Sequence, residues 1–185
     1  LGSSASTPKI NKYTTSQLLR IRNHHILIDC GEGIQMQLRK LKINFSKISH
    51  IFISHLHGDH YFGLIGLIST FRLLGRDSDL NIYAPEGLQE LINMQLKLSS
   101  SWLNYKIFFH ILKSKNQKII FNNQDFEVKT IPLKHRIYTN GFLFEEKFHE
   151  RNIYKSKIKE YNLKIDDIKK IKNGDDILLQ DGKKL

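Results

Sequence analysis

The residues best suited to chemistry lie together in the stretch Ser54-His55-Leu56-His57-Gly58-Asp59-His60. This stretch follows the mostly apolar run of residues 50–54 and places three imidazoles and one carboxylate within six residues. Neutral imidazole and carboxylate groups are the usual protein ligands of zinc and similar divalent metals. His55 and His57 are two positions apart and therefore project to the same side of an extended backbone. A polar loop whose histidines only cap a strand is the alternative, but four ligand-type side chains at this spacing favour a metal site.

Two further features extend this expected site. Gly58 allows the backbone to turn, so that Asp59 and His60 can face a second ion close to the first. His135 follows a predicted strand, as the loop at His55 does, and is the best candidate for a further ligand. A lone histidine is usually not a ligand, but its place at a strand end favours that role in a chain that already carries a metal loop.

Asp29 is another candidate functional residue. It ends the short apolar run Ile26–Ile28 and is followed by Cys30 and two nearby glycines. In this position it can bind a metal directly or hydrogen-bond a ligand histidine. It can also cap the helix expected from Ile34, and the two kinds of role are not exclusive.

The charge of the chain points to a polyanionic partner. There are 29 Lys and Arg against 18 Asp and Glu, a formal net charge of +11 at pH 7. Each cation that neutralises a phosphate releases a condensed counterion, which favours binding to nucleic acid. Lysine-rich coding in an AT-rich genome is the alternative explanation. Lys9 and Lys12, in a polar loop near the start, are candidates for phosphate contacts, although most such loops are only solvated surface.

The cellular compartment is indicated by three features. Cys30 is the single cysteine, which excludes an internal disulfide framework and suits a reducing cytoplasm. The chain has no run of roughly 18 apolar residues that could span a membrane. Its start has neither the basic region nor the apolar core of a signal peptide. We therefore expect a cytoplasmic protein without a membrane segment.

The apolar pattern predicts a layered α/β fold, with a sheet between helices and another sheet. Helices are expected from residue 34, at 61–74 and at 88–99. Strands are expected at 17–22, 25–29, 48–54, 80–84, 105–109, 118–121, 126–131 and 140–145.

The character of the chain changes at Phe148, so we divide it into domains of residues 1–147 and 148–185. The second part is basic and poor in large apolar clusters, with short helices expected at 153–161 and 165–171. It is either a solvated subdomain or an extension that grips an anionic substrate. The candidate RNA contacts are Lys9 and Lys12 in the first loop, Arg136, and Lys169, Lys170 and Lys172 in this second part.

The motif His55-Leu56-His57-Gly58-Asp59-His60 resembles the HxHxDH signature of the metallo-β-lactamase superfamily. Further blocks resemble the ribonuclease Z family of tRNA 3′-processing endonucleases and run in that family's order. These blocks are residues 1–8, 27–38, 54–64, 82–88, 132–136 and 141–142. The HxHxDH motif alone is specific only to the superfamily, and its combination with the Asp29-Cys30-Gly31-Glu32-Gly33 block indicates the ribonuclease Z branch.

This resemblance implies an αββα sandwich with two zinc ions at one sheet edge. The implied ligands are His55, His57 and His135 for one ion, and Asp59 and His60 for the other, with Asp29 as a supporting residue. The segment from Phe148 resembles the family's protruding arm that clamps the elbow of tRNA, with Asp181-Gly182 near its base. A homodimer is also implied.

The family's later ligands have no counterpart before Leu185. They are an aspartate that bridges both metals, a histidine on the second metal and a further catalytic histidine. We therefore interpret the chain as the N-terminal two-thirds of a longer protein. The intact site would bind two zinc ions, and this chain by itself one or none.

The implied function is zinc-dependent removal of the 3′ trailer from precursor tRNA. Two cations activate a water molecule for attack on the phosphodiester, and Asp59 would bind one ion and orient the water or accept its proton. One alternative is a hydrolase of the same superfamily that acts on small esters. Another is a catalytically incompetent RNA-binding or dimerisation fragment.

Overall fold

The structure is a computed structural model that describes residues 1–185 except 8, 180–181, 183 and 185. Asp181 and Leu185, which were named above, and the last residue of the 1–8 block therefore lie outside the described residues. The chain forms two compact units, Leu1–Glu145 and Glu146–Leu185, and each is described by itself. The assignment of the second unit as an RNA-gripping arm stays a prediction.

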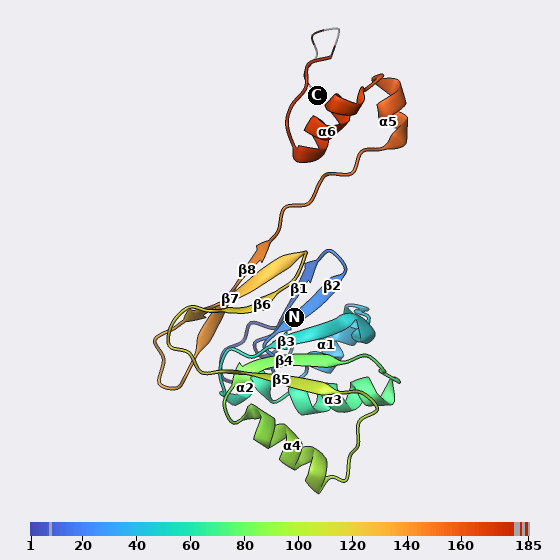
Figure 1. Ribbon diagram of the computed structural model, residues 1–185. Helices are drawn as coiled ribbons and strands as arrows, with labels where there is room; N and C mark the ends of the chain where they lie inside the picture. Colours follow the sequence, from blue (N-terminus) through green and yellow to red (C-terminus); the bar gives the residue numbers. More distant parts are fainter. Residues whose placement is uncertain (8, 180–181, 183, 185) are drawn as a thin grey trace. The chain divides into compact units, whose positions relative to one another are not determined.

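A five-stranded sheet forms the centre of the first unit, in the order β1-β2-β3-β4-β5 (Figure 1). The pair β1–β2 is antiparallel, and the pairs from β2 to β5 are parallel. A second sheet has the order β6-β7-β8. The strands are β1 (Gln17–Ile21), β2 (His24–Ile28), β3 (Ile48–Phe52), β4 (Leu80–Pro85), β5 (Ile107–Leu112), β6 (Ile119–Asn122), β7 (Phe126–Pro132) and β8 (Asn140–Glu146).

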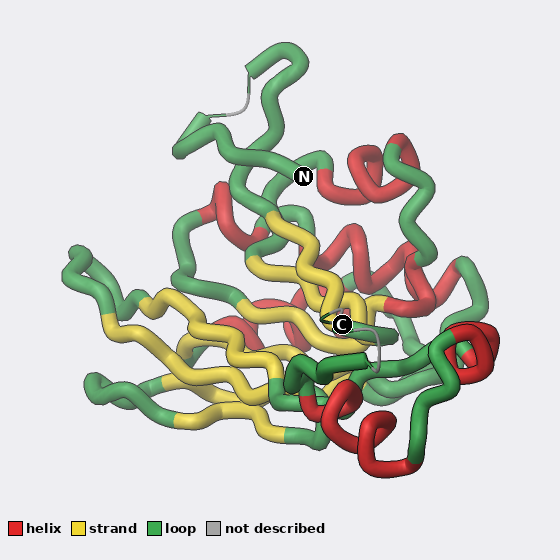
Figure 2. Tube along the Cα trace, turned by 90° about the horizontal axis from the view of Figure 1, so that it is seen from above, coloured by secondary structure: helices red, strands yellow, loops and turns green. Residues whose placement is uncertain are grey.

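The helices of this unit lie on one face of the five-stranded sheet, and the three-stranded sheet covers the other (Figures 1 and 2). The longer connections between the parallel strands carry helices, as parallel pairing requires. The helices are α1 (Ile34–Lys40), the 3-10 helix η1 (Phe45–Lys47), α2 (Gly58–Tyr61), α3 (Leu64–Leu73) and α4 (Leu88–Leu98).

Successive side chains of β2 and β3 point alternately into two apolar cores. Leu27 and Ile51 point to the helices, where they join Leu67 of α3 in one buried cluster. Their chain neighbours Ile26 and Phe52 point to the opposite face and pack in a second cluster that contains residues of β7. Alternation of this kind follows from the two-residue period of a strand. It makes β2 and β3 apolar on both faces, which is typical of a sheet that is covered on both sides.

Several of the expected element boundaries are wrong. The helix expected at 61–74 begins only at Leu64, as α3, and the short helix α2 precedes it. Between the two helices, Gly63 N donates to Cys30 O at 2.9 Å. A β-carbon at Gly63 would lie 2.2 Å from Gly31 O, so glycine permits this close approach. The strand expected at 105–109 is β5, Ile107–Leu112, and Tyr105 before it is buried and donates its hydroxyl to Ile68 O at 2.9 Å.

The second unit contains the short helices α5 (Lys155–Glu160) and α6 (Ile165–Asn173). Arg151 N donates to Lys172 O at 2.8 Å, which ties the segment before α5 to the end of α6. An ion pair between Lys172 Nζ and Glu150 at 3.1 Å strengthens the same link. In the part of the chain that the structure describes, no helix is long and apolar enough to cross a membrane.

Leu67 and Leu73 provide a stability test within one helix. Leu67 is fully buried, whereas Leu73 is 78% exposed. We expect Leu67→Ala to lower the free energy of unfolding by about 3 kcal/mol, because it removes buried methyl groups and leaves a cavity. Leu73→Ala should change it by less than about 0.5 kcal/mol. Urea unfolding followed by circular dichroism measures both, and equal losses would contradict the assignment of this helix face.

Candidate metal centre

The candidate metal centre is built where β3 ends. Ile53 continues from β3 and donates its N–H to Tyr83 O of the neighbouring strand at 2.8 Å. The chain then leaves the sheet, and His57 is the N-cap of the short helix α2. This is the carboxyl edge of the parallel strands, where open α/β sheets generally bind their ligands. The local fold therefore places the His55–His60 segment at an edge suited to binding.

Three histidines meet at this edge. Each of His55, His57 and His135 offers one ring nitrogen, and these nitrogens lie within 4.8 Å of one another. The Nδ1 atom of His57 is 3.1 Å from His55 Nε2 and 3.3 Å from His135 Nε2. In a tetrahedral zinc site with bonds of about 2.0–2.1 Å, two ligand nitrogens are about 3.3 Å apart. The donor set therefore fits a metal ion in both chemistry and spacing.

His55 is held in a form that can bind a metal. It is buried, and this burial, followed by repulsion from His60 and His57, lowers its pKa to about 4. Its ring is therefore neutral at physiological pH. Ser54 Oγ lies 2.9 Å from His55 Nδ1 and 3.0 Å from Asp29 Oδ2. When the Ser54 hydroxyl donates to the Asp29 carboxylate, its oxygen accepts a hydrogen bond from His55 Nδ1–H. The Nε2 atom of His55 then keeps a free lone pair.

Asp29 orients His60. Its Oδ2 lies 2.8 Å from His60 Nδ1, and its Oδ1 accepts the Ser54 backbone N–H at 2.8 Å. Burial by itself lowers the pKa of His60, but the hydrogen bond and charge of Asp29, aided by Asp59, outweigh it and raise the pKa. Asp29 does not cap α1, whose N-cap is Gly33.

Asp59 is held from the N-terminal loop. Ser6 N donates to its Oδ2 at 2.8 Å, and the same oxygen lies 3.5 Å from His60 Nε2. Asp59 and His60 are thus adjacent, with His60 Nε2 facing the carboxylate. Among the described residues they form no three-ligand group of their own. Their role as ligands of a second ion stays a prediction.

Among the candidate RNA contacts that the structure describes, Arg136 lies beside the histidine cluster. Its Nη2 lies 3.4 Å from His57 Nε2. When His57 Nδ1 binds a metal, its Nε2 carries the ring proton and cannot accept a hydrogen bond from a guanidinium. The exposed Arg136 side chain is then available to an anionic ligand beside the cluster.

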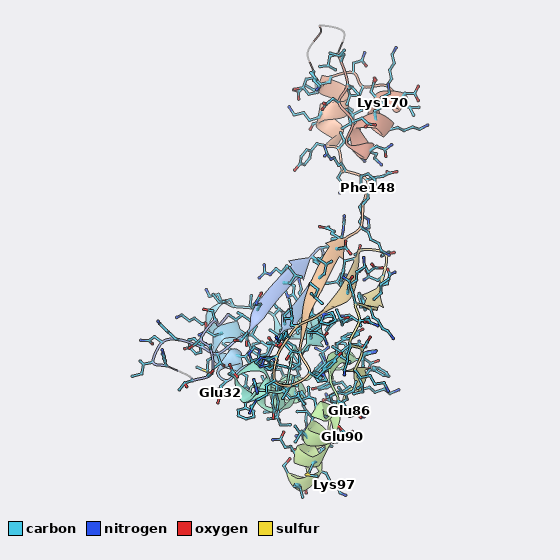
Figure 3. The ribbon with its side chains drawn as sticks, turned by 90° about the vertical axis from the view of Figure 1, so that its left-hand side faces the viewer. Glu32, Glu86, Glu90, Lys97, Phe148 and Lys170 are labelled. Carbon is cyan, nitrogen blue, oxygen red and sulfur yellow. The ribbon has the colours of Figure 1, made fainter. Side chains whose placement is uncertain are left out.

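The other candidate RNA contacts are on the surface or in the second unit. Lys9 and Lys12 are exposed in the N-terminal loop. Lys169 and Lys170 are exposed on α6, and Figure 3 labels Lys170 there. Lys172 is half-buried and paired with Glu150, so its charge is partly neutralised.

Sequence reasoning missed the contributions of Ser54 and Ser6. The only signal for Ser54 was its position between an apolar run and the first histidine. Ser6 acts through its backbone N–H, which any residue other than proline provides. No pattern in the sequence could have identified that contact.

Comparisons with known proteins match nearly the whole chain. The sequence model of the family described as "Anti-Pycsar protein Apyc1" matches residues 1–182. Ribonuclease Z of Bacteroides thetaiotaomicron is 46% identical over 182 residues, which are 98% of this chain and 58% of the relative. Ribonuclease Z of Porphyromonas gingivalis is 37% identical over 183 residues, 99% of this chain and 60% of the relative. The chain thus spans less than two thirds of the length of these relatives.

Solved structures agree with the fold. The short form of human tRNase Z superposes with a TM-score of 0.73 at 34% identity, covering 79% of this chain and 62% of that protein. The metallo-β-lactamase fold protein YhfI of Bacillus subtilis has a TM-score of 0.58 at 18% identity and covers 77% of this chain and 56% of its own. The expected metallo-β-lactamase fold is therefore confirmed. The chain belongs to the family described as anti-Pycsar protein Apyc1, has the metallo-β-lactamase fold and is a homologue of ribonuclease Z.

Proposed function

We propose that the protein is a zinc-dependent endoribonuclease that removes the 3′ trailer of precursor tRNA. The observation that supports the metal dependence is the cluster of ring nitrogens of His55, His57 and His135, in which His57 Nδ1 lies 3.1 Å and 3.3 Å from the other two and all three lie within 4.8 Å of one another. The similarity to proteins named ribonuclease Z and tRNase Z supports the substrate. The family model has a different description, so the tRNA substrate rests on these relatives and not on family membership alone.

The chain's own residues would hold the reacting groups in place. Zinc, when bound by the three histidines, would supply a Lewis acid and lower the pKa of the attacking water. Asp59 would orient that water and accept its proton, since its carboxylate lies beside His60 at the same edge. Arg136 would face the phosphate and stabilise its charge.

The basic surface favours RNA over a small ester. The net charge is +11, and most of the candidate lysines are exposed. Contacts of lysine with phosphate position an RNA without reading its bases. A steep loss of binding with added salt is expected for tRNA, whereas a small ester would show little salt dependence.

Two further properties belong to the proposal. We infer a cytoplasmic location, because the single cysteine, Cys30, is buried and free. We also infer a homodimer by analogy with the family, to which α1 and α3 would contribute. The exposed apolar side chain of Met36 lies on α1.

We expect His57→Ala to abolish metal-dependent cleavage by the full-length protein. The exchange removes a ring nitrogen that lies close to both of the other ring nitrogens. Loss of a residue that only supports a metal ligand lowers metal affinity by up to about 100-fold. Loss of a ligand itself should therefore lower it by more than this. Binding of precursor tRNA should stay nearly unchanged. Elemental analysis, gel shift and cleavage assays measure the three effects.

His110→Ala is the control, because His110 is an exposed histidine that stacks on Tyr83 away from the cluster. It should change neither metal content nor cleavage. Loss of tRNA binding by His57→Ala with unchanged metal content would count against the proposed role of His57.

Asp29→Asn tests the orientation of His60. The change keeps the shape of the side chain but removes the charge beside His60 Nδ1. Loss of such a supporting carboxylate typically costs about 10–100-fold in metal affinity, and we expect that loss here in titrations monitored by calorimetry.

The matched control is Asp125→Asn. Asp125 makes a similar contact, 2.9 Å from His24 Nε2, in another part of the first unit. Equal metal affinities of the two variants would argue that Asp29 has only a structural role.

Residues 1–185 alone should bind zinc weakly at the second position and cleave precursor tRNA poorly. The reason is that Asp59 and His60 form no three-ligand group among the described residues. Metal stoichiometry and single-turnover cleavage measure this. Normal turnover with two zinc ions per chain would overturn the expectation.

A further inference from the structure

A polar cavity lies between the N-terminal loop and helix α1, outside the metal centre that would carry the proposed cleavage chemistry, and two of the candidate RNA contacts, Lys9 and Lys12, line it. Its volume is about 460 Å³, within the range of roughly 300–1,000 Å³ that is common for small-molecule sites. Residues on both sides of the loop line it, together with one face of α1. The residues that matter for binding are Lys9, Asn11, Lys12, Tyr13, Gln37 and Lys40.

The lining of this cavity is basic. Three lysines contribute to it, and no carboxylate of a residue that the structure describes does. None of Lys9, Lys12 and Lys40 forms an ion pair with any residue that the structure describes. Three like charges around one cavity repel each other, and an anion between them would relieve that repulsion. The charge pattern thus selects an anionic ligand.

Gln37 provides a second and independent sign of a ligand. Its side chain is only 7% exposed, and its Nε2 is covered and has no hydrogen-bond partner among the described residues. A buried donor without a partner is unfavourable, because it has lost its hydrogen bonds to water and gained none in return. The terminal torsion of a glutamine is soft, so the amide can turn its Nε2 toward a ligand in the cavity. An acceptor oxygen there would remove the cost.

We propose that this cavity binds a phosphate group, carried either by an RNA strand or by a small phosphorylated molecule. Its oxygens would accept hydrogen bonds from Gln37 Nε2 and from the lysine ammonium groups, which are charge-assisted and therefore strong. The polar side chains of Asn11 and Tyr13 offer further partners for the group that carries the phosphate. This binding needs neither the metal centre nor the proposed cleavage activity.

The test uses the chain after treatment with a chelator, so that phosphate cannot bind through a metal. Calorimetric titration with inorganic phosphate and with adenosine 5′-monophosphate should show saturable binding to one site. Lys40→Gln should weaken it about tenfold, the effect of losing one charged hydrogen bond. Lys42→Gln is the matched control, because Lys42 is an exposed lysine two residues further on that does not line the cavity. It should change the affinity by less than about twofold.

Gln37→Glu replaces the buried amide by a carboxylate of the same shape and should abolish binding. Its folding is checked by circular dichroism, and if it does not fold, the pair Lys40→Gln and Lys42→Gln decides. A short RNA hairpin that displaces adenosine 5′-monophosphate identifies RNA as the source of the phosphate, and failure to displace it identifies a small molecule. Absence of saturable binding, or equal losses in the two lysine variants, overturns the proposal.

Discussion

The hydrogen bonds of Asp29 determine how the candidate metal centre is arranged. Asp29 directly follows β2, and its carboxylate accepts the N–H of Ser54, which follows β3. The same carboxylate contacts His60 Nδ1 and the hydroxyl of Ser54 that faces His55. One buried side chain therefore joins the ends of two parallel strands and orients two histidines. A residue in this position must have a positive φ, here 56°, which aspartate tolerates better than most residues.

The two apolar cores make this arrangement rigid. Because β2 and β3 are covered on both faces, neither strand can slide by one residue without moving Leu27 or Ile51 out of its core. The strand ends are thus fixed, and with them the positions of Asp29 and Ser54. The metal ligands themselves lie in a loop, where the backbone can turn and the imidazoles can meet. Core packing is in this way connected to the spacing of the ring nitrogens.

The sequence was informative wherever the relevant contacts are local. His55, His57 and Asp59 could be assigned as candidates because one short motif contains them, and most strands and helices followed from their apolar period. Other features depend on contacts between distant segments. The break at Gly63 arises from its close approach to Gly31, more than thirty residues earlier. The approach of His135 to His57 could be expected from its place at a strand end, but its distance could not.

The N-terminal loop connects the candidate metal centre with the basic cavity. Ser4 lines the cavity and is tied to the opposite side of the loop by its N–H, which donates to Tyr13 O at 2.9 Å. Two residues further along, Ser6 N donates to Asp59. A ligand that fixes the loop from the cavity side would also fix the donor that holds this carboxylate. An anion in the cavity would thus influence the position of Asp59 by fixing the N-terminal loop, and not by contacting Asp59 directly.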